Sequence, residues 1–169
     1  MPLPTRPVSH ASVASVWGQQ VHDYTFAPAG MLCSGGTITA PAADAWGTLP
    51  IDTAVDDPGG YVDTANNRVE IPTDGAGLYV FRIRVSSDDG AATDRSQIRL
   101  TVNGSEVYRN TETQEGGDII TLNIGAMVDV TVGDLLRVQA RQVGSGARAS
   151  LTLTGFDMVR IGFERGAPS

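Results

Sequence analysis

The chain has 169 residues, the length of a single domain, and its 41% hydrophobic and 18% charged residues exclude an intrinsically disordered polymer. Its formal net charge of −7 argues against electrostatic capture of nucleic acid or of an anionic membrane, and we expect neither partner. No apolar run reaches the roughly 18 residues of a membrane-spanning helix, residues 1–18 carry no secretory apolar block, and the lone Cys33 excludes an internal disulfide.

Residues 1–34 are predicted to form an N-terminal arm, extended or partly helical, ahead of a main domain at 35–165 and a short tail at 166–169. Apolar residues in the arm follow a helical spacing, although Gly18 and three β-branched valines weaken a helix there. These candidate partner-binding residues are Val13, Val16, Trp17, Val21 and Tyr24. After the arm, the chain is rich in proline and glycine, with strand-like pieces at 37–40 and 46–51.

Strict alternation begins further along the chain. In Gly77–Ser86 the residues Tyr79, Phe81, Ile83 and Val85 share one face, and Arg82 and Arg84 lie on the other, which predicts a half-buried strand. Arg95–Val102 repeats the pattern, with Ile98, Leu100 and Val102 inward and Gln97, Arg99 and Thr101 outward. Asn103-Gly104 then predicts a two-residue hairpin turn, because both positions of a type I′ turn need positive φ.

The remaining strands follow at short intervals. We expect two strands at 118–124 and 127–132, a turn at Gly133-Asp134, and a strand over Leu135–Val143 whose inward side chains include Leu136 and Val138. A last pair of strands is expected within 149–162. Short strands separated by turns, without helical periodicity, predict an all-β antiparallel sandwich or barrel.

Catalytic candidates are few. The two histidines, His10 and His22, both lie in the arm, and no spacing typical of a zinc site is present. An acyl transfer through Cys33 and His22 is conceivable, but an isolated cysteine among small residues is more often inert. We therefore expect no enzyme, no catalytic residues, no metal and no cofactor.

Three further motifs have simpler structural explanations. Gly144–Ala149 matches a phosphate-binding fingerprint superficially, but strands are predicted on both sides of it and the fingerprint needs a following helix. The acidic pairs at 56–57 and 88–89 do not follow a calcium-loop pattern and are expected to be solvated turn carboxylates. Asn103–Ser105 is formally a glycosylation sequon and is explained by the hairpin turn.

All twelve basic residues are arginine. Arginine suits bidentate, partly buried ion pairs, which would fit a surface covered by partner chains, whereas a GC-rich genome would give the same bias without any function. The outward arginines are expected to form cross-strand and inter-subunit ion pairs on a sheet face; they are Arg82, Arg84, Arg99, Arg137 and Arg141.

Four segments in order carry a resemblance to the C1q/TNF jelly-roll family. They are IPTDGAGLYVFRIRV (71–85), IRLTVNG (98–104), VTVGDLLRVQ (130–139) and LTGFDMVRIG (153–162). They resemble the family's P-x-x-G-x-Y-x-F strand, NG hairpin, GD turn and closing strand, over about 100 residues from Tyr61 to Gly162. The closing strand departs from the pattern, because Gly155 precedes Phe156 instead of following it.

The resemblance implies a ten-stranded antiparallel jelly roll that assembles as a homotrimer. Family members include secreted ligands and trimeric proteins of tailed-phage particles, and the arm resembles those of small phage structural proteins. We therefore expect a capsid decoration protein on the surface of the virion, assembled in the host cytoplasm, whose arm binds the major capsid protein. A tail-fibre or baseplate receptor-binding module and a bacterial C1q-like interaction module remain alternatives, and the arm residues could equally pack on the protein's own sandwich.

Overall fold

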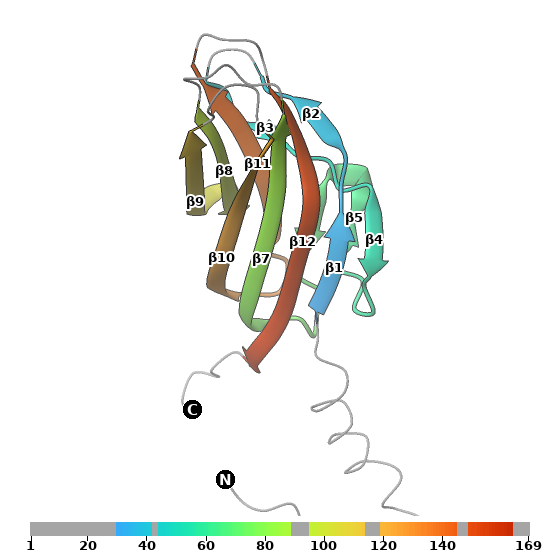
Figure 1. Ribbon diagram of the computed structural model, residues 1–169. Helices are drawn as coiled ribbons and strands as arrows, with labels where there is room; N and C mark the ends of the chain where they lie inside the picture. Colours follow the sequence, from blue (N-terminus) through green and yellow to red (C-terminus); the bar gives the residue numbers. More distant parts are fainter. Residues whose placement is uncertain (1–29, 42–43, 89–94, 114–118, 145–148, 164–169) are drawn as a thin grey trace, which may run out of the picture.

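The computed structural model describes residues 30–41, 44–88, 95–113, 119–144 and 149–163, and these form a sandwich of two antiparallel sheets (Figure 1). The all-β prediction is confirmed. The strands are β1 Gly30–Ser34, β2 Thr37–Thr39, β3 Gly47–Thr48, β4 Thr53–Asp56, β5 Val62–Asp63, β6 Arg68–Glu70, β7 Gly77–Asp88, β8 Arg95–Val102, β9 Ser105–Thr113, β10 Ile120–Val130, β11 Leu135–Val143 and β12 Ser150–Phe163, with a single 3-10 turn, η2 Thr64–Asn66, in this part of the chain.

The strands alternate between the two layers. Sheet A has the order β10-β7-β12-β1-β4, with β2 also paired to β12, and sheet B has the order β5-β6-β11-β8-β9, with β3 paired to β11. Figure 1 shows β10, β7, β12 and β1 side by side in one layer. Because β6, β7 and β8 and then β10, β11 and β12 cross from one sheet to the other, the topology is that of a jelly roll.

The core lies between the sheets and follows the predicted alternation. Along β7, Tyr79, Phe81, Ile83 and Val85 are buried, whereas the intervening arginines are exposed. The Phe81 ring packs against Tyr79 on its own strand and against Phe156 of β12, at centroid distances of 6.0 and 6.2 Å. Aromatic side chains therefore join β7 to β12 at the centre of the sandwich.

Two predicted strand pairs are single strands. β10 continues through Gly125, which is exposed and has no atom near its missing Cβ, so this glycine does not break the strand. β12 continues through Gly155, where a bulge lies between Leu153 and Gly155 in the pairing with β7. A Cβ at Gly155 would come within 2.9 Å of the Arg84 side chain. This glycine allows a close approach within a strand and is not a turn residue.

The hairpin between β8 and β9 is confirmed, with φ of 51° at Asn103 and 81° at Gly104. The inward face of β8 is confirmed to its end, because Ile98 and Leu100 are buried and the half-buried Val102 packs against the core. Thr101, predicted to lie outward, is nevertheless buried, and its hydroxyl donates to the backbone oxygen of Arg137 on the neighbouring β11. The register shift in the pairing with β9 adds its extra residue to β9, so the period-two pattern of β8 continues past it.

The sandwich begins earlier than predicted, because residues 30–34, assigned to the arm, form β1 between β12 and β4. β4 itself was not predicted. The candidate partner-binding residues Val13, Val16, Trp17, Val21 and Tyr24 lie outside the described residues, as does the tail at 166–169. Within the described ranges, no helix is long and apolar enough to cross a membrane.

Candidate interaction surface

The outer face of sheet A carries an apolar row that crosses neighbouring strands. Val80 of β7 lies opposite Val159 of β12 on one side and Met127 of β10 on the other. Their exposed fractions are 39%, 43% and 61%, so all three side chains meet water on the outer face of the sheet. Leu32 of β1 extends the apolar surface on the far side of β12. We call Leu32, Val80, Met127 and Val159 the apolar face.

An ion pair lies beside the apolar face, at the next outward-facing pair of residues on β7 and β12 after Val80 and Val159. Arg82 lies opposite Asp157, and its Nε and Nη2 donate to Asp157 Oδ2 at 3.1 and 2.9 Å. The other oxygen of this carboxylate, Oδ1, is buried and accepts no hydrogen bond from the described residues. The prediction that Arg82 forms a cross-strand ion pair on a sheet face is confirmed.

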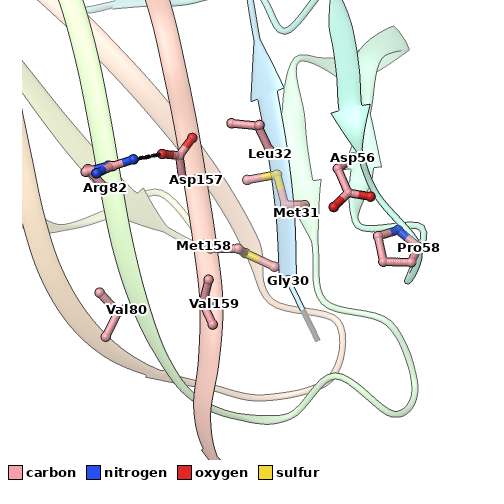
Figure 2. A pocket seen from close by; sticks show the side chains of 10 residues that line it. All are labelled: Gly30, Met31, Leu32, Asp56, Pro58, Val80, Arg82, Asp157, Met158 and Val159. Carbon is pink, nitrogen blue, oxygen red and sulfur yellow. Dashed lines mark hydrogen bonds and ion pairs between the residues drawn. The ribbon is translucent and has the colours of Figure 1, made fainter. Parts of the chain in front are cut away.

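The same region is hollowed into a groove of about 440 Å³. Figure 2 shows the Val80–Val159 pair and the Arg82–Asp157 pair next to each other along β7 and β12, with Leu32 and Met31 of β1 on the other side. The lining residues are Gly30, Met31, Leu32, Asp56, Pro58, Val80, Arg82, Asp157, Met158 and Val159. Apart from the ion pair and Asp56, the lining is apolar, which suits the burial of another apolar surface.

The chemical candidates from the sequence form no reactive site in the described part of the chain. Cys33 is fully buried, its Sγ donates to the backbone oxygen of Phe156, and His22 lies outside the described residues. The Asp57 carboxylate accepts from the backbone N–H groups of Tyr61 and Val62, which explains it as a turn cap. No cluster of metal-ligating side chains occurs among the residues that the structure describes. Residues 145–148 of the glycine-rich segment lie outside this part of the chain.

Burial raises the pKa of the Cys33 thiol to about 12, from an ordinary value of 9.0, and the nearby Asp157 and Asp57 charges add to the shift. Each pKa unit is a tenfold change in the thiolate fraction, so we expect the thiol to react with iodoacetamide about a thousandfold more slowly in the folded protein than in guanidinium chloride at pH 8. Mass spectrometry of the alkylated fraction over time measures both rates. Equal rates would show that Cys33 is accessible and would reopen the case for a nucleophile.

Two features of the surface were not predicted from the sequence. Val80 lies on the outward face of β7 together with Arg82 and Arg84, and an apolar residue in that register was the available signal. The second feature is Trp46, whose ring lies against the guanidinium groups of Arg99 and Arg141 on sheet B. No local pattern connects this tryptophan with those strands.

No family model matches the sequence, and no curated protein matches it. Solved structures of similar fold include the globular domain of zebrafish complement 1qA protein, with a TM-score of 0.59 at 14% identity, covering 79% of this chain and 97% of that chain. Eiger TNF from S. frugiperda gives a TM-score of 0.59 at 15% identity, over 84% of this chain and 98% of that one. The fold is a C1q/TNF-like jelly roll. Murine APRIL has the same jelly roll, with a TM-score of 0.55 at 14% identity, over 78% of this chain and 99% of that chain.

Proposed function

We propose that this jelly roll is a non-enzymatic, homotrimeric binding module that serves as a capsid decoration protein of a tailed phage. The observation that carries the proposal is the apolar face, which crosses β10, β7, β12 and β1 on the outer side of sheet A, where alternation would otherwise place polar residues. Monomers seldom expose contiguous apolar surface of this kind without an interaction partner. A second copy of the chain is the partner that we propose for the apolar face, because it is present wherever the protein is made.

Self-association through the apolar face is supported by its energetics. Burial of a fully exposed valine, leucine or methionine side chain contributes about 1.5–3 kcal/mol. The four side chains of the apolar face are between 36% and 61% exposed in the protomer, so each would contribute roughly 1 kcal/mol on association. A closed ring of three protomers would bury every copy of the face, as closed symmetry requires. The trimer number comes from the resemblance to the C1q/TNF family.

The capsid role extends the trimer proposal with the N-terminal arm. Three arms on one trimer would bind three neighbouring capsid subunits at a raised effective concentration, so modest contacts by residues such as Trp17 and Tyr24 would suffice. A ligand that binds only the assembled lattice stabilises that lattice by mass action. The proposed location is therefore the outer surface of the virion, and the major capsid protein is the proposed partner.

Copy number per purified particle tests this role, measured by quantitative mass spectrometry against the major capsid protein. Hundreds of copies would support decoration of the head. A handful of copies would overturn it in favour of the tail-fibre or baseplate alternative, and absence from particles would leave a cellular interaction module.

Removal of residues 1–26 should leave a folded trimer that no longer binds capsids, because the sandwich begins at β1 and the proposed capsid contacts lie before it. Circular dichroism, light scattering and co-sedimentation with capsids lacking the protein measure the three properties. His10→Ala, outside the apolar stripe of the arm, is the control that should still bind. An unfolded product would show instead that the stripe packs on the protein's own sandwich.

A further inference from the structure

On sheet B, remote from the apolar face, three guanidinium groups surround one tryptophan. Trp46 directly precedes β3, and its ring centroid lies 4.2 Å from the guanidinium carbon of Arg99, 4.5 Å from that of Arg141 and 5.5 Å from that of Arg109. β3 pairs with β11, which carries Arg141, and β11 pairs with β8, which carries Arg99. Cation–π contacts thus hold the arginines on one side of the sheet.

Neutral side chains orient two of these arginines. Arg99 Nε donates to Gln139 Oε1 at 2.9 Å, and Arg141 Nε donates to Gln97 Oε1 at 2.7 Å. Gln139 in turn donates to the Thr48 hydroxyl. Amide acceptors fix the direction of a guanidinium group without cancelling its charge, whereas a carboxylate would cancel it.

The cluster carries more positive than negative charge. Glu106 is ion-paired with Arg109 at 2.7 Å and Arg99 at 3.3 Å, and the Arg109 hydrogen bond lowers the pKa of Glu106, so it is ionised at neutral pH. Arg141 bonds to Gln97 and to the backbone oxygen of Asp44, both neutral acceptors. The negative charges are those of Glu106 and the exposed Asp44. The guanidinium groups of Arg99, Arg109 and Arg141, together with Arg137 on the same strand as Arg141, outnumber these two carboxylates.

Arg137 belongs to the same outward face of β11, four residues before Arg141. It is half-buried, and its side chain makes no hydrogen bond or ion pair within the described part of the chain. At about 3.3 Å per residue, the two arginines lie roughly 13 Å apart along the strand. We call Trp46, Arg99, Arg109, Arg137 and Arg141 the arginine surface. It is a row of oriented cations on a protein whose net charge is −7.

We propose that the arginine surface binds an acidic polysaccharide through carboxylate groups that repeat along the sugar chain. Guanidinium groups pair with carboxylates in a bidentate manner, and a polymer can engage the separated arginines at once. Single-stranded nucleic acid fits less well, because it needs aromatic faces for base stacking and the Trp46 ring already lies against guanidinium groups. This proposal is independent of the trimer, because the surface lies on the other sheet.

The test is isothermal titration of the full chain with a size-defined oligogalacturonate, with a neutral maltooligosaccharide of equal length and with a single-stranded oligonucleotide. We expect binding to oligogalacturonate that weakens as salt rises, no binding to the neutral sugar, and weaker binding to the oligonucleotide. Arg141→Gln should lower the affinity at least about tenfold, as expected for the loss of a charge-assisted contact. Arg137→Gln should also weaken binding, and among the described residues it removes no side-chain hydrogen bond or ion pair.

Arg84→Gln is the matched control, because Arg84 is an exposed arginine on sheet A and its loss changes the net charge equally. Its affinity should stay within about twofold of wild type. Equal losses in all three variants would reduce the binding to overall charge and overturn a defined site. Failure to bind oligogalacturonate, or tighter binding of the oligonucleotide, would also overturn the proposal.

Discussion

Replacement of Val80 by aspartate should convert the proposed trimer into a folded monomer. Val80 lies between Val159 and Met127 at the centre of the apolar row, and its outward side chain has no role in the core. Because only 39% of Val80 remains exposed in the protomer, the substitution removes about 1 kcal/mol of apolar burial on association. It would also place an unpaired carboxylate in the interface, at a cost of several kcal/mol more. Sedimentation velocity should show the loss of the trimer peak, and circular dichroism should be unchanged.

Val132→Asp is the control for this substitution. Val132 is 51% exposed in the turn between β10 and β11 and lies off the sheet face, so the same chemical change there should leave the trimer intact. If Val80→Asp remained trimeric, the apolar face would not be the interface. If both variants dissociated, added negative charge and not position would be responsible.

The largest effect on folding is expected from Phe81→Ala. Phe81 is fully buried and packs between Tyr79 and Phe156, so its truncation leaves a cavity in the aromatic contact that joins β7 to β12. A substitution of this kind costs about 3–5 kcal/mol. That is a large part of the roughly 5–15 kcal/mol by which most domains are stable.

Urea unfolding followed by circular dichroism measures the loss, with wild type and variants at one protomer concentration because association contributes to apparent stability. Tyr108→Ala is the control: Tyr108 is an aromatic residue of the edge strand β9 with 41% exposure, and its truncation should cost less than about 1 kcal/mol. Similar losses for both variants would contradict the assigned core.

Where the sequence alternates cleanly, it was enough to predict the structure. β7, the hairpin at Asn103-Gly104 and β11 follow from period-two patterns and a positive-φ turn, and each is confirmed. The glycines at 125 and 155 were harder, because a glycine within a strand can mark either a turn or a bulge. Only pairing with a neighbouring strand distinguishes the two, and that pairing is a long-range property.

The candidate surfaces were less predictable than the fold. The apolar face depends on the register between strands, which aligns Val80 with Val159 and Met127 although they are distant in the chain. Trp46 reaches Arg99 and Arg141 only because β3 adds to the edge of β11. The predicted ion pairs with carboxylates are confirmed for Arg82, which pairs with Asp157, and for Arg99, which pairs with Glu106. Arg141 instead bonds to neutral acceptors such as Gln97.

We propose above that this jelly roll functions as a trimer closed through the outer face of sheet A. The most direct measurement is the mass of the full chain by native mass spectrometry and multi-angle light scattering over a hundredfold range of concentration. We expect a single species at about three times the 17.7 kDa chain mass. A monodisperse monomer at 17.7 kDa throughout that range would contradict it.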